Sequence, residues 1–252
     1  MRKFFGAALT VALLTAGPAS ASTMTFLGQD AGLGDGNGAL ALHPLSDAAR
    51  NSFFSYLVNI RTETFESFAV GPVSTPPGLE SPSVEATFNG DATAGVYMAG
   101  GALGGLPLGR YPVSGEKYYE DGTNSSLSVV FMNPIRAFGF YGIDVGDWNG
   151  QLTLTLKKAS TPDRVINIAN DFGDNVLGGG ILYFGLLVTD PSESFTSIQF
   201  GNTATGSDVF GFDDFSVGDV APVPEPTSLV LLGTGVVAAI AARRRRAKKS
   251  VE

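Results

Sequence analysis

The chain lacks cysteine altogether and has a single histidine among its 252 residues. Without cysteine it can form neither a disulfide nor a thiolate metal site, and it has no thiol nucleophile. The lone histidine, His43, precedes Pro44, and no Gly-x-Ser-x-Gly motif occurs, so the sequence argues against triad hydrolysis. A folded domain without disulfides must depend on a full hydrophobic core, a bound metal ion, or both.

Two charge-free apolar runs lie near the ends of the chain. At the N-terminus, Arg2 and Lys3 precede an apolar stretch over residues 4–16, and a small-x-small Ala-Ser-Ala follows. A basic start, a short apolar stretch and small residues at the cleavage site are typical of a secretory signal peptide. The sequence therefore predicts a signal peptide over residues 1–21, cleaved before Ser22.

The second charge-free run follows a proline-rich segment at residues 222–226. Proline fixes φ and removes an amide donor, so this segment should be extended and exposed. Residues 227–242 carry no charge and would span about 24 Å as a helix, short of the roughly 30 Å hydrocarbon core but tolerable when flanking arginines snorkel. Basic residues fill most of 243–249. The pattern predicts a transmembrane helix over 227–242 and a cytoplasmic tail over 243–252, with the rest of the chain outside.

These C-terminal features together resemble the PEP-CTERM sorting signal of exported bacterial proteins. The elements that carry the resemblance are Pro224, Glu225 and Pro226, the apolar span, and the basic cluster of Arg243, Arg244, Arg245 and Arg246. The resemblance implies that an exosortase in the membrane recognises the Pro-Glu-Pro motif and removes the helix. It also implies that the protein is first held in the inner membrane and then reaches the cell surface or the extracellular matrix.

Basic residues are scarce between the two targeting segments. The chain has 16 Lys and Arg against 24 Asp and Glu, but half of the basic residues lie in the targeting segments. Residues 22–221 therefore carry 8 basic and 22 acidic residues, a net charge near −14. Such a balance argues against binding to nucleic acid or to an anionic membrane surface. It is compatible with cation binding or simply with solubility.

The first part of the mature chain, residues 22–42, is rich in Gly, Asp and Asn. This composition predicts a flexible leader. The alternative is a calcium loop in which Asp30, Asp35 and Asn37 supply oxygen ligands, although the spacing lacks the alternation and terminal Glu of an EF-hand loop.

One helix is predicted within residues 22–61, from about residue 47 to residue 57. Ser46 is a suitable N-cap, and Asp47 would lie favourably at the positive end of the helix dipole. Aromatic and aliphatic residues recur at i, i+4 spacing, so one face of the helix should pack on the body of the protein.

Residues 62–221 are expected to form a single antiparallel β-sandwich with jelly-roll topology, because short Val-, Phe-, Thr- and Tyr-rich segments alternate with Gly and Pro. The clearest strand is Leu-Thr-Leu-Thr-Leu at 152–156, whose alternation predicts one buried face. The predicted strands cover residues 62–68, 84–88, 95–98, 126–131, 137–145, 151–157, 164–169, 181–188, 195–200 and 209–217.

The last of these strands contains a change of parity. Phe210 and Phe212 share one face, whereas Phe215 and Val217 have the opposite parity. All four can be buried only if one extra residue is accommodated between them, so the sequence predicts a β-bulge at Asp213-Asp214. Two adjacent acids there are either a cation site or solvated side chains.

The body also resembles ectodomains that occur with PEP-CTERM tails and, more loosely, lectin-like and carbohydrate-binding-module sandwiches. The segments concerned are residues 64–68, 137–147 and 208–215. In such sandwiches a Phe-Glu on the first strand and an Asp on the last strand often share a structural calcium ion. The resemblance thus implies Glu66 with Asp213 or Asp214 as calcium ligands.

A second candidate site contains Asp144, Asp147, Trp148 and Tyr141. The aromatic side chains could stack on a sugar ring while the acids hold hydroxyl groups or calcium, but Trp148 could equally pack on the sandwich. Three functions therefore remain open: a non-catalytic structural or adhesive surface protein, a calcium-stabilised carbohydrate-binding module acting on exopolysaccharide, and an acidic-residue glycoside hydrolase. Of these three functions, we expect the structural or adhesive one.

Overall fold

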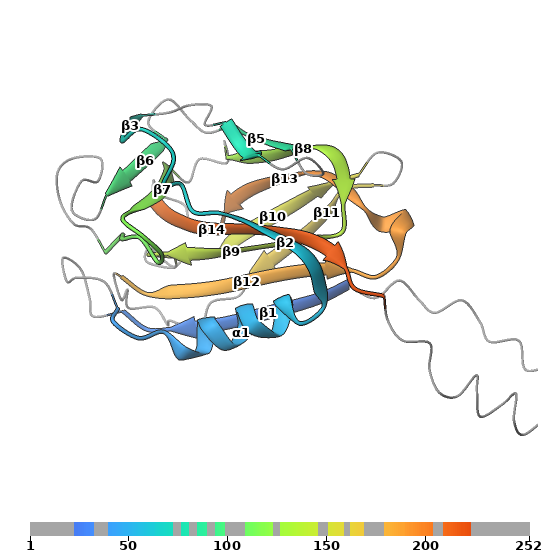
Figure 1. Cartoon of the computed structure of the whole chain (residues 1–252), viewed down its shortest axis with the longest axis horizontal. Helices are drawn as coiled ribbons and strands as arrows, with labels where there is room; N and C mark the ends of the chain where they lie inside the picture. Colours follow the sequence, from blue (N-terminus) through green and yellow to red (C-terminus); the bar gives the residue numbers. More distant parts are fainter. Residues whose placement is uncertain are drawn as a thin grey trace, which may run out of the picture. The chain divides into compact units, whose positions relative to one another are not determined.

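The computed structural model describes residues 23–32, 40–72, 77–80, 85–89, 94–98, 109–122, 127–145, 151–158, 162–168, 179–203 and 209–222. These residues form two antiparallel β-sheets with one α-helix outside them, so the predicted fold class is confirmed (Figure 1). None of the helices within these ranges has the length and apolar character needed to cross a membrane.

The larger sheet, sheet A, has eight strands in the order β1-β12-β9-β14-β7-β6-β3, with β2 also paired to β14. Their bounds are β1 Thr23–Asp30, β2 Leu57–Glu63, β3 Gly71–Pro72, β6 Gly95–Met98, β7 Lys117–Gly122, β9 Ala137–Ile143, β12 Ile181–Val188 and β14 Val209–Val220.

The smaller sheet, sheet B, has six strands in the order β11-β10-β13-β8-β5-β4. Their bounds are β4 Pro77–Glu80, β5 Glu85–Asn89, β8 Ser128–Ile135, β10 Leu152–Lys157, β11 Arg164–Ile168 and β13 Phe195–Asn202. A short 3₁₀ helix, η2 (Pro191–Glu193), connects β12 to β13.

The strand order confirms the jelly-roll prediction. When the eight consecutive strands β7 to β14 are numbered 1 to 8, sheet A contains the order 1-8-3-6 and sheet B contains 5-4-7-2. This is the order produced when a chain passes back and forth between two sheets in two Greek keys.

The hydrophobic core fills the space between the two sheets. Along β10 the leucines at 152, 154 and 156 are buried and the residues between them are half-buried, as the alternation predicts. Phe140 lies at the centre of the core, where its ring centroid is 5.2–6.1 Å from those of Phe138, Phe184, Phe200, Phe212 and Phe215. Rings at these distances bury large apolar areas and gain from edge-to-face contact.

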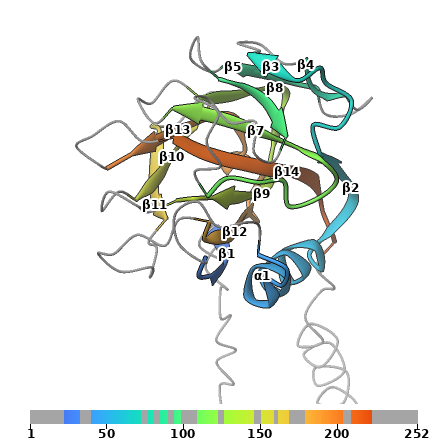
Figure 2. The same ribbon diagram turned by 90° about the vertical axis from the view of Figure 1, so that its left-hand side faces the viewer.

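The helix α1 (Pro44–Phe54) covers the outer face of sheet A, on the side away from β10 and β11 (Figure 2). Glycines allow this close approach. A Cβ added at Gly185 would stand 2.7 Å from Cγ of the fully buried Phe53, and one added at Gly28 would stand 2.1 Å from the carbonyl oxygen of Leu45. The helix therefore rests directly on the backbone of β1 and β12.

The predicted helix boundaries and cap are wrong. The helix begins three residues earlier, at Pro44, because proline is well suited to the first turn, and His43 is the N-cap without a side-chain cap bond. Ser46 lies inside the first turn, where its Oγ donates to the Asp30 carboxylate at 2.8 Å. Leu57 opens β2 rather than closing the helix, because the following Val- and Ile-containing run pairs with β14.

The predicted flexible leader is wrong for Thr23–Asp30, which form β1 and pair along their full length with β12. The Gly and Asp content of the neighbouring residues hid the strand signal of Met24 and Phe26. Asp30, an alternative calcium ligand, accepts hydrogen bonds from the amides of Leu45 and Ser46. The other two candidates of that loop, at 35 and 37, lie outside the described residues.

The predicted bulge in β14 is confirmed. Asp213 pairs with Tyr141, but Ser216 pairs with Gly139, so β14 contains one extra residue at this point, and Asp214 has a φ of +50°. The four apolar side chains at 210, 212, 215 and 217 are all buried. On its other edge β14 pairs first with β7 and then with β2, so the bulge lies where the partner strand changes.

The other strand predictions differ in detail. The strands at 95–98 and 181–188 have the predicted bounds, whereas β1, β3, β4 and β7 were not predicted. The predicted strand at 62–68 lies instead at Leu57–Glu63, because the chain turns at Phe65, whose φ is +60°.

The start of β1 and the end of β14 lie at the same end of the strands of sheet A. Thr23 at the start of β1 pairs with Val188 at the end of β12, and Leu187 pairs with Ala137 at the start of β9. Because β14 runs antiparallel to β9, it ends beside the start of β9. We call this the exit end, which is on the right in Figure 1.

Candidate functional site

A strap of residues 109–116 crosses the outer face of sheet A beside α1 and leads into β7. Tyr111 and Val113 of the strap pack in the same apolar cluster as Phe53 of α1 and Tyr141 of β9. The polar groups of the strap bond to carboxylates from other segments. Four of the site residues predicted from sequence, at 66, 144, 213 and 214, bond to the strap.

The bulge acids hold the middle of the strap. Asp213 is fully buried, and its Oδ2 accepts hydrogen bonds from the amides of Val113 at 2.8 Å and Ser114 at 3.0 Å. Its Oδ1 accepts from the amide of Asp214 at 2.7 Å, while Ser114 Oγ donates to Asp214 Oδ1 at 2.6 Å. The bulge therefore aims two adjacent carboxylates at one turn of the strap.

Burial controls the protonation of these two acids. Desolvation raises the pKa of Asp213 to about 8, and the neighbouring Asp214 carboxylate adds to the rise, while the three amide donors act in the opposite direction. Burial likewise raises the pKa of Asp214, against the effect of its bond from Ser114. Both groups thus hold a proton more strongly than an exposed aspartate does.

Glu66 holds the other end of the strap from the turn that follows β2. Its Oε1 accepts from the amides of Glu116 and Lys117, both at 2.8 Å. Lys117 Nζ in return donates to the carbonyl oxygens of Glu66 and Phe68. Gly115 is required between them, since its φ is +63° and an added Cβ would stand 2.3 Å from Glu66 Oε1.

The three predicted calcium ligands therefore contact the same strap, at different places along it. Amide N–H groups of the strap and of Lys117 bond to one oxygen of each of Glu66 and Asp213. Among the described residues, no three His, Asp or Glu side chains are grouped closely enough to hold a metal ion. Calcium binding stays a prediction.

A buried charge network fixes the start of the strap. Arg110 Nε donates to Glu120 Oε2 at 2.9 Å, and its Nη1 donates to Asp144 Oδ2 at 3.0 Å. All three residues are buried, with at most 5% of their surface exposed. Tyr118 donates to the same Glu120 oxygen at 3.1 Å. Burial acts to lower the pKa of Arg110, but the charges of Glu120 and Asp144 raise it above its usual value. The network therefore keeps its cation at neutral pH.

The predicted sugar-binding residues occupy different environments. Asp144 is buried. Its Oδ2 accepts from Arg110, and its Oδ1 accepts from the amide of Gly179. Tyr141 is fully buried, and its hydroxyl donates to Asp47 Oδ1 at 2.5 Å. Neither side chain faces solvent, as a group that stacks on or bonds to a sugar must. Asp147 and Trp148 lie outside the described residues, and their role stays a prediction.

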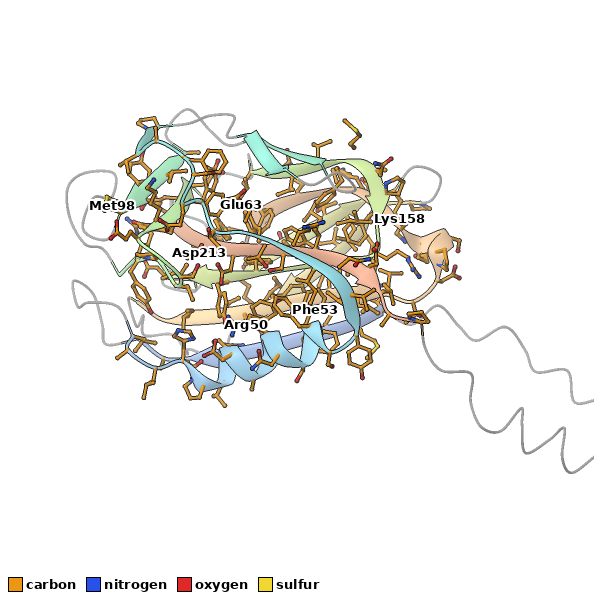
Figure 3. All side chains as sticks on the ribbon, viewed as in Figure 1. Arg50, Phe53, Glu63, Met98, Lys158 and Asp213 are labelled. Atoms are coloured by element: carbon orange, nitrogen blue, oxygen red, sulfur yellow. The ribbon has the colours of Figure 1, made fainter. Side chains whose placement is uncertain are left out.

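Asp47 lies at the centre of a second cluster of polar side chains, between α1 and sheet A. Besides Tyr141, its Oδ1 lies 3.2 Å from His43 Nδ1 and 3.7 Å from an Arg50 nitrogen. The Arg50 guanidinium also lies over the Tyr141 ring at 5.7 Å. Figure 3 labels Arg50 on α1 and Asp213 on β14.

Sequence reasoning missed Arg110, Ser114, Glu120 and the strap itself. One signal was present: Arg110 is the only basic residue between Arg61 and Lys117 in an acidic domain. Nothing in the local sequence names its partners, however, since Asp144 is 34 residues away. The described carboxylates act chemically as hydrogen-bond acceptors that attach the strap to the sheet.

Three of the solved structures that match the chain do so at low similarity. The K2 cleaved adhesin domain of Lys-gingipain (Kgp) has a TM-score of 0.36 and 12% identity, with 63% of this chain and 97% of that chain covered. TmCBM61, solved with β-1,4-galactotriose, has a TM-score of 0.29 and 15% identity, covering 65% and 98%. The enzymatically active domain of tailspike protein 4 from bacteriophage CBA120 has a TM-score of 0.30 and 11% identity, covering 55% and 19%. Similarity at this level does not indicate what the present chain binds.

The C-terminal segment gives a more definite result. No curated protein matches the chain in sequence. Residues 222–246, which include the predicted motif at Pro224, Glu225 and Pro226 and the arginines from 243 to 246, match a family model described as the PEP-CTERM protein-sorting motif. From residue 223 onward these residues lie outside the described part of the chain. The chain therefore carries a PEP-CTERM protein-sorting motif, the sorting signal of exported proteins.

Proposed function

We propose that this chain is a cell-surface or extracellular-matrix protein with a non-catalytic structural or adhesive role, processed by an exosortase-type membrane enzyme at Pro224-Glu225-Pro226. The observation that carries the proposal is the match of residues 222–246 to the PEP-CTERM motif. Its last part is basic and follows an apolar stretch, as a membrane stop requires.

The bonding of the sandwich supports a structural role. The buried acids at 120, 144, 213 and 214, together with the exposed Glu66, all bond to the strap. A domain in which these carboxylates bond to one internal segment, and whose core is held without disulfides, is suited to presenting a stable surface outside the cell.

Intact-mass analysis of the secreted and membrane fractions tests the proposal. We expect an extracellular form that begins at Ser22 and ends near Pro224–Pro226. Replacing Glu225 and both motif prolines by Ala should abolish that form, while the matched replacement Val223→Ala should leave it. Retention of the chain through Glu252 in every fraction would instead show an ordinary C-terminal anchor.

Structural calcium is a separate question. Because Glu66 and Asp213 each use one carboxylate oxygen to hold strap amides at different places along the strap, we expect the melting temperature of the full chain to be unchanged by a chelator. A fall of several degrees on chelation, reversed by Ca²⁺, would show that an ion is bound. Retention on polysaccharide that is lost in Trp148→Ala would favour the carbohydrate-binding alternative.

A further inference from the structure

The two sheets end in edge strands of two different kinds. The edge strands β3 and β4 have two and four residues, and they contain Pro72 and Pro77. Short length and proline keep an edge strand from pairing with another chain. The edge strands β1 and β11 have eight and five residues, contain no proline, and pair with their neighbours without a register shift. They therefore lack the features that protect the other two edges.

The strands β1 and β11 lie on the same side of the sandwich (Figure 2). Arg164, the first residue of β11, donates to the hydroxyl of Thr23, the first residue of β1, and so joins the two sheets at the exit end. Among the described strands β1 pairs only with β12, and β11 only with β10. A strand edge of this kind presents backbone N–H and C=O groups to another strand. We call the surface formed by Thr23–Asp30 and Arg164–Ile168 the double edge.

The double edge carries little charge. Its two strands contain one acid and one base, and Asp30, the acid, accepts from the amides of Leu45 and Ser46. Leu27 of β1 is 42% exposed. It lies in a groove of about 650 Å³ that runs between β1 and α1 and is lined by uncharged residues alone. In a domain with a net charge near −14, an uncharged surface with exposed leucines is suited to contact with another protein surface.

A second copy of the chain matches the double edge better than a single extended peptide does. A peptide can pair with one strand edge, but this surface has two, and packed sheets are about 10 Å apart. A second copy presents two edges with the same separation, so both can pair at once about a two-fold axis. Because two such acidic domains repel each other, a contact through their least charged strands also keeps the repulsion small.

We propose that the double edge is the interface of a homodimer, in which edge strands of the two copies pair and continue both sheets from one copy into the other. The inference supplies a partner for the structural role proposed above, and that partner is a second copy of this chain. It does not depend on processing at the sorting motif.

Sedimentation equilibrium of the full chain in a non-ionic detergent tests the proposal. We expect two copies per particle, with a dissociation constant that falls about tenfold from low to high salt as the repulsion is screened. Leu27→Lys places like charges at the interface and should raise the dissociation constant about a hundredfold. The matched control is Met132→Lys, at a residue that is 67% exposed on β8 in the interior of sheet B, and it should leave the constant unchanged.

Cross-linking locates the contact without adding charge. The chain has no native cysteine, so Thr25→Cys on β1 and Asn167→Cys on β11, both at exposed residues, can be treated with a short bis-maleimide singly and as a mixture. At least one of these preparations should give a cross-linked dimer on a denaturing gel, whereas Met132→Cys should give none.

Three results would each overturn the inference: one copy per particle at high salt, equal dissociation constants for the two Lys variants, or no cross-link from either edge strand. The cross-linking result stands even if Leu27→Lys does not fold. Processing is measured separately by the intact mass of the secreted form, so failure of the dimer and failure of the proposed function are distinguishable.

Discussion

The two faces of sheet A are covered in different ways. The inner face packs on sheet B through aliphatic and phenylalanine side chains. The outer face is covered by α1 and the strap, and there buried carboxylates bond to amides, to Arg110 and to tyrosine hydroxyls. Side-chain volume should therefore decide stability on the inner face, whereas charge balance and the close approach of backbone should decide it on the outer face.

The largest effect is expected on the inner face. Phe140→Ala removes the ring at the centre of the core and should lower the free energy of unfolding by about 4 kcal/mol, measured by denaturant titration. Val165→Ala, at a residue that is 66% exposed on β11, is the control and should change it by less than about 0.5 kcal/mol. Similar losses in both variants would remove the distinction between core and surface.

The outer face should be most sensitive to loss of its buried cation. Arg110→Met leaves the carboxylates of Glu120 and Asp144 buried without a counter-charge, which should cost about 3 kcal/mol in the same titration. Adding Glu120→Gln and Asp144→Asn to that variant should recover most of the loss. If the triple variant is no more stable than the single one, packing rather than charge holds this part of the strap.

Backbone approach beneath α1 gives the next test. Gly185→Ala forces a methyl group against Phe53 and should cost about 2 kcal/mol. The control is Gly211→Ala, where the nearest side-chain atoms are 3.3 Å from the added Cβ and small movements suffice. The comparison requires only the melting temperatures of the two variants; equal values would mean that α1 is free to move away from the sheet.

The last prediction concerns the bulge. Its effect is a slope, the change in the free energy of unfolding per pH unit, and this slope is smaller than the losses above. The pKa of Asp213 is about 8 in the folded chain against 3.8 as its ordinary value, so the folded state binds this proton more tightly than the unfolded state does. Its contribution to stability is then full below about pH 4 and is lost as the pH rises towards 8, by at most about 1.4 kcal/mol per unit. Asp213→Asn should flatten the stability profile over that range. A profile that is unchanged by the substitution would place the titration elsewhere.

The inner face was largely predictable because its signals are local. Alternation at 152–156 identified a buried face, and the parity change between Phe212 and Phe215 located the bulge. Each inference needs only a strand's period of two and the assumption that large apolar side chains are buried.

The outer face was not predictable for the opposite reason. The strap amides at 113 and 114 meet acceptors 99–100 residues further along the chain. β7 escaped detection because Lys-Tyr-Tyr-Glu-Asp-Gly has charged residues on both faces, and Glu120 is tolerated inside only because Arg110 neutralises it. Pairwise charge compensation of this kind leaves no periodic trace in a sequence.

The position of β14 has a mechanical consequence. It is the longest strand, it has partners on both edges, and the sorting segment follows it directly. A load applied through the C-terminal side of the chain therefore enters the sandwich along a central strand and acts on its hydrogen bonds in shear, all at once. A load applied at Thr23 would instead reach β1, which among the described strands pairs only with β12, and could peel it away. The domain is thus built to resist force at the end where it would be tethered.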